Sequence, residues 1–290
     1  MNGARDIQLV QPSRPTIEGA GVHLRRAFGY GQETLFDPFL MLDDFRSNDP
    51  SLYQAGFPWH PHRGIETITY MLEGEVDHGD SLGNKGAIRG GDVQWMTAGS
   101  GIIHQEMPQG DRDGVMEGFQ LWANLPARQK MIHPRYQGFQ ADEIPLARPR
   151  GARVRVVCGR VGDVVGPVTG IAIDPELLDV SLEPEAVWSH PTPPGHTYFA
   201  YLFEGGGRFG AGTDRVPAGK GTLILLGDGA SATAQAGPDG ARFLLAGGRP
   251  LREPIAWRGP IVMNTREELE TAWRELDNGT FVKTGDLRIG

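Results

Sequence analysis

The chain has 290 residues, and its 28 lysines and arginines against 36 aspartates and glutamates give a formal net charge of −8. This length allows one large domain or two of ordinary size. The 42 glycines and 22 prolines are too many for a helical bundle, because both residue types break helices. An acidic chain offers no basic surface to a phosphate backbone, so the composition argues against direct binding to nucleic acid.

The sequence predicts a soluble protein of a reducing compartment. Its first residues lack the apolar core of a signal peptide, and no run of about 18 apolar residues occurs. We therefore expect a cytoplasmic location and no membrane contact. The single cysteine, Cys158, lies in an apolar run, so it can form no internal disulfide and is expected to be a small buried side chain.

Short runs with period-two alternation, ended by glycine turns, follow one another along the first half of the chain. They predict strands at residues 65–72, 93–97 and 117–125. This spacing is typical of an antiparallel sandwich or barrel rather than of βαβ units. Alternation is lost at residues 141–151, which we interpret as a linker. A second series of strands is predicted after it, at residues 153–157, 197–203, 223–226 and 242–246.

The two halves resemble copies of one unit. The segment from Tyr70 to Gly74 matches that from Tyr201 to Gly205 at an offset of 131 residues. A second short match begins at Gly91 and Gly221, at an offset of 130. Agreement in register between two matches favours a duplicated β-barrel.

One helix is predicted near the end of the chain. Thr265 and Glu268 have the spacing of a capping box, which satisfies free backbone amides at a helix start. Leu269, Trp273 and Leu276 then share one helical face, and an asparagine–glycine pair follows as a stop signal. We expect this helix to pack across a sheet.

Four potential metal ligands fall into two short groups. His60 and His62 form the first, and His104 and Glu106 form the second. In a strand, residues i and i+2 face the same side about 6 to 7 Å apart. Each group therefore presents two donors side by side, and the four donors converge if the two strands are neighbours in a barrel.

Three imidazoles and one carboxylate make a mixed site for Fe(II), Mn, Ni, Cu or Zn. Four ligands leave about two positions open on an octahedral ion, as binding of a substrate oxygen, dioxygen or water requires. A closed structural zinc site would more often use cysteine, and Cys158 lies far away in the sequence. The alternative is that these are ordinary exposed or hydrogen-bonded histidines.

Other residues near the ligands have two interpretations. Phe57, Trp59, Trp95 and Met96 either line an apolar pocket for a flat aromatic substrate or pack in the core. Arg63 either steers an anionic substrate oxygen or pairs with a carboxylate.

The remaining histidines are not expected to bind the metal. His23, His78 and His133 have no donor two residues away. His190 and His196 flank a proline-rich loop and are expected to be surface or hydrogen-bonded residues. Adding the repeat offset of 131 to the four ligand positions reaches only proline, glutamine and glycine, so the second half is predicted to hold no metal.

The sequence around the ligands resembles the cupin superfamily and, more specifically, the pirin family. His60, His62, Glu66 and Gly74 resemble the first cupin motif. The second motif is about two residues too long and has Pro108 where asparagine is usual, a departure that matches pirins. The segments that carry the pirin resemblance are residues 36–45, 60–66, 70–74, 94–108, 250–254 and 259–264.

This resemblance implies an all-β fold of two tandem cupin-type antiparallel barrels, each a double-stranded β-helix, with a short C-terminal helix. It implies a metal-binding barrel over residues 1–135 and a barrel without metal ligands over residues 150–290. The implied ligands are His60, His62, His104 and Glu106, and the usual metal is iron. Glu66 is a ligand in many other cupins but not in pirins, so we expect it on a sheet face or beside the ligands.

Two functions of different classes follow from the resemblance. The first is a dioxygenase of the quercetin 2,3-dioxygenase type, which uses Fe(II), or else Zn, Mn, Ni or Cu, and opens the heterocycle of a flavonol with dioxygen. In this reading Glu106 is both ligand and catalytic proton acceptor. The second is a metal-loaded, redox-sensitive binding protein that regulates a transcription or metabolic partner protein. Either protein is expected to be a monomer, and the residues leave the choice open.

Overall fold

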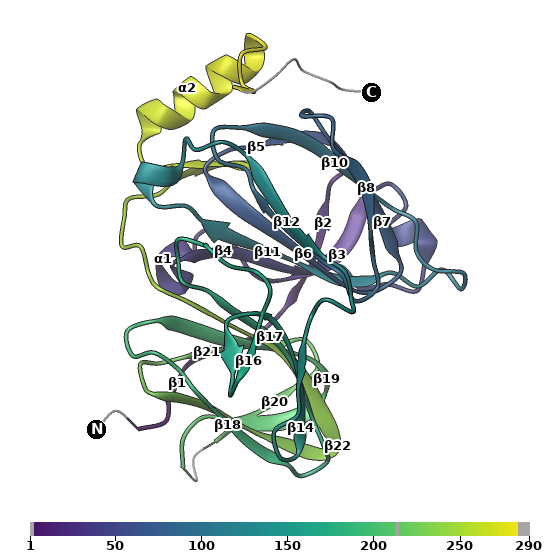
Figure 1. Ribbon diagram of the computed structural model, residues 1–290, viewed down its shortest axis with the longest axis vertical. Helices are drawn as coiled ribbons and strands as arrows, with labels where there is room; N and C mark the ends of the chain where they lie inside the picture. The colour runs from purple at the N-terminus through teal and green to yellow at the C-terminus, as the bar shows by residue number, and fades with distance from the viewer. Residues whose placement is uncertain (1–2, 213–214, 284–290) are drawn as a thin grey trace. The chain divides into compact units, whose positions relative to one another are not determined.

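The computed structural model describes residues 3–212 and 215–283, which form β-strands with two α-helices. Contacts divide the chain into two compact units, each visible in Figure 1. The N-terminal unit contains Pro15–Thr34, Phe39–Ala141 and residues 252–283, and the C-terminal unit contains residues 3–14, Leu35–Pro38 and Asp142–Leu251. Among the described residues, no helix has the length and apolar character needed to cross a membrane.

Two sheets and one hairpin build the N-terminal unit. Its strands are β2 (Arg14–Glu18), β3 (Val22–Phe28), β4 (Phe39–Asp44), β5 (Phe57–His62), β6 (Ile65–Glu73), β7 (Glu75–Asp80), β8 (Lys85–Arg89), β9 (Val93–Thr97), β10 (Ile102–Pro108), β11 (Glu117–Asn124), β12 (Arg135–Phe139), β23 (Ala256–Arg258) and β24 (Ile261–Met263). The larger sheet has the order β12-β9-β6-β11-β4-β3-β2, the smaller β5-β10-β7-β8, and β23 pairs with β24. Side chains of both sheets line one cavity, which therefore lies between them.

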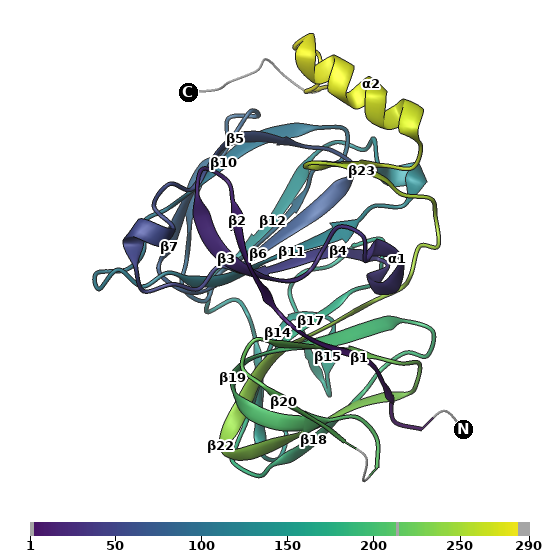
Figure 2. The same cartoon turned by 180° about the vertical axis from the view of Figure 1, so that it is seen from behind.

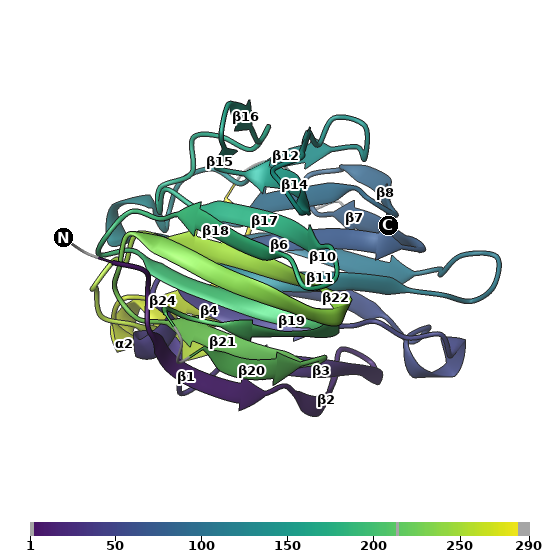
Figure 3. The ribbon, with the colours of Figure 1, turned by 90° about the horizontal axis from the view of Figure 1, so that it is seen from below.

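The C-terminal unit is built around one large sheet. Its strands are β1 (Ile7–Pro12), β13 (Leu146–Ala147), β14 (Ala152–Cys158), β15 (Arg160–Val161), β16 (Val164–Val165), β17 (Glu176–Leu182), β18 (Val187–Pro191), β19 (Thr197–Phe209), β20 (Val216–Gly219), β21 (Thr222–Leu226) and β22 (Ser231–Gly248). The order is β1-β21-β19-β22-β17-β14-β13, with β18 on β22 and β20 on β19, and Figure 3 shows these strands side by side. The short helix α1 (Glu33–Phe36) lies between β3 and β4 in the chain.

The predicted all-β fold with a short C-terminal helix is confirmed. Every strand predicted from alternation coincides to within a residue with an observed strand or lies within one, but β19 runs on to Phe209 and β22 begins as early as Ser231. The repeated tyrosines, Tyr70 in β6 and Tyr201 in β19, are both buried, as expected for copies of one unit. Cys158 is a buried free cysteine, also as predicted.

Glycine turns hold the two ligand-bearing strands in place. Gly64 follows β5 with a φ of 77°, and a Cβ there would overlap the Val262 carbonyl oxygen. Gly99 precedes β10 with a φ of 50°, and a Cβ there would overlap the Ile132 carbonyl oxygen. Only glycine combines this left-handed backbone with so close an approach.

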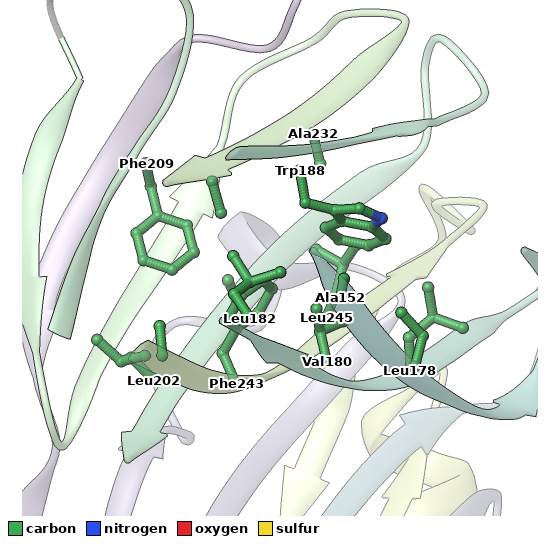
Figure 4. Packing of buried hydrophobic residues seen from close by; sticks show 14 of the residues in the cluster. Ala152, Leu178, Val180, Leu182, Trp188, Leu202, Phe209, Ala232, Phe243 and Leu245 are labelled. Carbon is green, nitrogen blue, oxygen red and sulfur yellow. The ribbon is translucent and has the colours of Figure 1, made fainter. Parts of the chain in front are cut away.

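The interior of the C-terminal unit is filled by apolar side chains. Figure 4 shows Trp188, Phe209 and Phe243 packed among leucines, valines and alanines from β14, β17, β18, β19 and β22. Each large aromatic side chain removes roughly 150 to 250 Å² from water. This packing stabilises the second barrel.

Two described segments, residues 3–14 and 252–283, belong to a different unit from the one that their sequence position suggested. The expected domains were residues 1–135 and 150–290, of which residues 1–2, 213–214 and 284–290 lie outside the described residues. Strand β1 pairs with β21 in the C-terminal unit, and residues 252–283 belong to the N-terminal unit. Figure 2 shows both segments, β1 and β23.

The C-terminal helix α2 (Arg266–Asp277) forms as predicted, with the capping box of Thr265 and Glu268 in place. Its buried face carries Leu269 and Ala272, which pack with residues of β24 and with Phe281. The three- and four-residue spacing of apolar positions predicts such a helix face, but it does not predict which sheet will cover that face. That choice depends on contacts between segments far apart in the sequence.

Candidate metal centre

The first ligand group lies on β5 and the second on β10, and these strands are antiparallel neighbours. In this register His104 is directly opposite His60. The ring centroids of His60 and His104 are 4.3 Å apart, and each lies within 5.0 Å of the His62 ring. The structure therefore brings the three histidines together, as the two-residue spacing on each strand predicts.

The three imidazoles offer nitrogen atoms that all lie within 4.8 Å of one another. Among the described residues, no second group of three or more histidine, cysteine or carboxylate side chains has its potential ligand atoms this close together. The two strands that carry the three histidines, β5 and β10, lie side by side in Figure 1. In the C-terminal unit, His190 is instead buried against Glu176, with 2.8 Å between Nε2 and Oε2. That histidine is hydrogen-bonded, as predicted.

Hydrogen bonds leave one nitrogen of each histidine for a ligand. His60 Nδ1 lies 2.9 Å from the Pro58 carbonyl oxygen, and His62 Nδ1 lies 3.1 Å from that of Pro260. A carbonyl only accepts, so both Nδ1 atoms carry the hydrogen and both Nε2 atoms keep a lone pair. Burial lowers the pKa of His60, His62 and His104, so the three rings are neutral near pH 7.

His104 shows most clearly that the three-histidine group suits a metal ion. Its side chain is 1% exposed, and its Nε2 has no hydrogen-bond partner among the described residues. A buried polar atom without a partner is costly, and a metal ion would satisfy it. Neutral imidazoles with free nitrogens are the ligands that a borderline divalent metal prefers. The residues present thus fit the metal that the resemblance implies.

Glu106 lies beside this group but not within it. Strand β10 has an irregular register between His104 and Glu106, which places Glu106 opposite Phe57. The carboxylate does not belong to the set of atoms within 4.8 Å of one another. Its Oε1 accepts a hydrogen bond from the Thr69 hydroxyl at 3.1 Å, and burial raises the pKa of Glu106 to about 7. Its role as a fourth ligand stays a prediction.

Glu66 faces another part of the sheet. It is 1% exposed and accepts a hydrogen bond of 2.6 Å from Thr97, its partner on β9. Burial raises its pKa. This is the sheet-face role expected for Glu66.

A cavity of about 590 Å³ opens beside the histidines. His60, His62 and Glu106 form part of its wall, while Thr69 and Gln120 add polar groups nearby. Most of the remaining lining is apolar or aromatic. Such a chamber, apolar with a few convergent polar groups, is typical of a site for a small organic molecule.

The aromatic residues divide between the cavity and the core. Phe57 lines the cavity, whereas Trp95 and Met96 are each 1% exposed and do not line it. The structure adds Trp122 of β11 and Trp257 of β23, which the sequence did not single out. Trp122 was recognisable as a member of an alternating strand, but Trp257 had no local signal.

Arg63 does not face the cavity. Its Nη1 lies 2.7 Å from Glu275 Oε2, its Nη2 donates to the Phe281 carbonyl oxygen at 2.8 Å, and its guanidinium covers the Phe281 ring. Of the two interpretations, pairing with a carboxylate is the one the structure supports. Arg63 thereby fastens α2 and the residues after it to the turn that follows His62.

Of the three histidines without a donor two residues away, His78 is the one that lies close to the metal centre. His23 and His133 are exposed, but His78 on β7 is 6% exposed, and its ring centroid lies 5.5 Å from that of His104. Its place opposite Glu106 depends on the pairing of β7 with β10. The two-residue spacing within one strand could not reveal it.

Metal affinity is expected to depend on the protonation of Glu106 if this carboxylate is a ligand. Because its folded-state pKa is raised to about 7, a proton must leave before a metal binds at lower pH. We expect the affinity for Co(II) to rise about tenfold per pH unit between pH 5 and 7 and to level off above. The raised pKa of Glu106 also affects the stability of the metal-free protein. Its contribution to the free energy of unfolding is fully present below pH 4.5 and is lost as the pH rises through 7.

Competition with a chromophoric chelator at several pH values measures this slope. The matched variant is Glu106→Gln, which keeps the size of the side chain and removes its titration. We expect a flatter profile for it between pH 5 and 7. The same slope in both proteins would show that Glu106 does not control metal binding.

Comparison with known proteins agrees with this site and fold. Residues 21–123 match the Pirin family model, and residues 177–282 match the model of the pirin C-terminal cupin domain. A pirin-like protein of Caulobacter vibrioides is 45% identical over 279 residues, covering 96% of this chain and 99% of that protein. Human pirin is 38% identical over 297 residues, covering all of both chains.

A solved structure gives the same result for the fold. The crystal structure of a quercetin 2,3-dioxygenase from Acinetobacter baumannii superimposes with a TM-score of 0.87 at 33% identity. The match covers 98% of this chain and 99% of that one. Both units therefore have counterparts in one known protein.

Proposed function

Because the chain belongs to the pirin family, we propose that it is a metal-dependent dioxygenase, with iron as its metal, that opens the heterocycle of a flavonol such as quercetin. The observation that supports this most is the set of three neutral histidines, with His62 and His104 buried and His60 half-buried, beside an organic-sized cavity. The similarity to the A. baumannii protein named quercetin 2,3-dioxygenase supports the choice of substrate. In this reaction both atoms of dioxygen enter the organic product, and one ring carbon leaves as carbon monoxide.

His60, His62 and His104 would hold the metal, with Glu106 as the proposed fourth ligand. A bound divalent metal supplies a Lewis acid that lowers the pKa of a coordinated hydroxyl and, in the case of iron, an accessible one-electron redox couple. The protein contributes the fixed nitrogen donors. Their orientation is set by the Pro58 and Pro260 carbonyl groups, so little reorganisation is needed when a ligand arrives.

The aromatic lining suits a flat, multi-ring substrate. The Trp122 ring contacts His62 edge to face, with centroids 5.0 Å apart, and Trp257 lies 6.2 Å beyond it. Both indoles line the cavity. Aromatic rings pack well against such walls in offset or edge-to-face arrangements. A flavonol held there would have its reacting hydroxyl directed toward the histidine end of the cavity.

Glu106 is the proposed proton acceptor. A carboxylate with a pKa of about 7 is well matched to taking a proton from a substrate hydroxyl at neutral pH. The Thr69 hydroxyl lies 3.1 Å from Glu106 Oε1 and 2.7 Å from Gln120 Oε1. Its single hydrogen can serve only one of them at a time. Once Glu106 takes up a proton, the Thr69 hydroxyl can donate to Gln120 instead.

Carbon monoxide release from quercetin tests the proposal. We expect tag-free, Fe(II)-loaded protein in air to release carbon monoxide and to form the ring-opened ester, detected by mass spectrometry. His62→Ala, prepared with the same iron, is the matched control and should be inactive. Equal release by the two proteins would rule the activity out, because free iron in solution would then explain it.

A further inference from the structure

His78 stands behind the metal-facing histidines and contacts one of them. Its Nε2 lies 3.4 Å from His104 Nδ1. The corresponding Nδ1 atoms of His60 and His62 are held by main-chain carbonyl oxygens. His104 is therefore the member of the group whose outer nitrogen is held by another side chain.

The contact matters because a neutral imidazole has one N–H and one lone pair. If the hydrogen of His104 is on Nδ1, it is donated to His78, and the lone pair of Nε2 faces His60 and His62. If the hydrogen is on Nε2, it points at a place where the described residues offer no acceptor. A buried N–H without an acceptor costs about 1 to 3 kcal/mol. The first arrangement is also the one in which Nε2 can bind a metal.

We propose that His78 is a positioning residue that fixes the tautomer and ring orientation of His104, so that all three histidines present Nε2 to the metal. This inference rests on the metal site of the proposed function and not on the identity of the substrate. Partners of this kind, placed behind a ligand, typically change metal affinity by 10- to 100-fold when removed.

The surroundings of His78 fix its own orientation. The side chain is 6% exposed and stands on β7 opposite Glu106. The Tyr136 hydroxyl lies 3.3 Å from the same Nε2, and the two rings meet edge to face with centroids 5.3 Å apart. Burial and the nearby Asp80 carboxylate raise the pKa of Tyr136. A carboxylate is a stronger acceptor than a neutral imidazole, so Asp80 is the preferred acceptor of the Tyr136 hydroxyl hydrogen. The lone pair of His78 Nε2 is then left for the N–H of His104.

The test measures the dissociation constant for Co(II) in tag-free protein, by competition with a chromophoric chelator. His78→Phe keeps the ring and removes the acceptor, and it should raise the dissociation constant about 10- to 100-fold. His78→Gln restores an acceptor on a side chain of similar length and should bring the constant back to within about threefold of wild type. His133→Phe changes an exposed histidine of the same unit and should have no effect.

Three results would overturn the inference. They are an unchanged constant in His78→Phe, a loss in His78→Gln as large as in His78→Phe, and an equal loss in His133→Phe. If wild type itself binds no Co(II), the metal site and this inference fail together. If it binds Co(II) but releases no carbon monoxide from quercetin, only the proposed reaction fails.

A second measurement does not depend on how the variants fold. In Zn(II)-loaded wild type labelled with ¹⁵N-histidine, NMR reports which nitrogen of each ring carries hydrogen. We expect His104 to carry it on Nδ1 and to have Nε2 bound to zinc. Zinc on Nδ1, or a hydrogen on Nε2, would overturn the inference directly.

Discussion

Replacing His104 with alanine is expected to weaken the binding of a divalent metal by roughly 10²- to 10³-fold. Binding energies of about 10 to 16 kcal/mol for four-ligand zinc sites correspond to about 2.5 to 4 kcal/mol per ligand. His104 lies within 5.0 Å of both other rings, so no neighbouring histidine can replace it without moving a strand. Chelator competition with Co(II) measures the change.

Thermal unfolding gives an independent measurement of the same loss. A metal that binds only the folded state stabilises it by mass action, so added metal should raise the Tm of wild type. We expect no such rise for His104→Ala at the same metal concentration. The control is His133→Ala, which removes an exposed histidine and should behave as wild type. A wild-type response in His104→Ala would contradict the proposed ligand set.

Replacing Lys130 with methionine is expected to destabilise the N-terminal unit by about 3 kcal/mol or more. The ammonium group is 1% exposed and donates to the Gly64 carbonyl at 2.8 Å, the Asn124 side chain at 2.6 Å and the Val262 carbonyl at 3.0 Å. Methionine fills similar space but removes all three hydrogen bonds, and the Gly64 carbonyl keeps only the Leu125 N–H at 3.4 Å. Each buried acceptor left without a donor costs about 1 to 3 kcal/mol. Urea unfolding followed by tryptophan fluorescence measures the difference.

The effect of Lys130 should depend on pH in a defined direction. Burial lowers its pKa from 10.5 to about 7, so between these values the unfolded chain binds more protons than the folded protein. Stability contributed by this group therefore rises with pH across that window. Lys130→Met should lack the rise. The matched control, Lys85→Met, changes an exposed lysine of β8, and a destabilisation equal to that of the control would refute this account.

Lys130 also connects the ligand strand to the C-terminal segment. Two of the carbonyl groups that accept hydrogen bonds from Lys130 lie close to His62 in this way. Gly64 is two residues after His62, and Val262 is two residues after Pro260, whose carbonyl oxygen holds His62 Nδ1. The Lys130 amine donates hydrogen bonds to both the Gly64 and the Val262 carbonyl groups. Where Lys130→Met folds, its His62 should be less well oriented, and the variant should bind Co(II) more weakly than wild type.

The sequence by itself determined the all-β fold, the internal repeat, the capped C-terminal helix and the shared strand face of His60 and His62. These features depend on periods of two and 3.6 residues and on turn glycines, which are properties of short segments. His60 and His62 share a strand face for that reason, and His104 meets them because β5 and β10 are neighbours.

Only the tertiary structure decided what surrounds those histidines. Pro260 lies 198 residues from His62, and Trp257 reaches the cavity from the same distant segment. His78 acts across a strand pair, and the irregular register of β10 separates Glu106 from the three-histidine group. No short segment encodes these contacts, because they depend on which strands pair and on which apolar faces the ends of the chain cover.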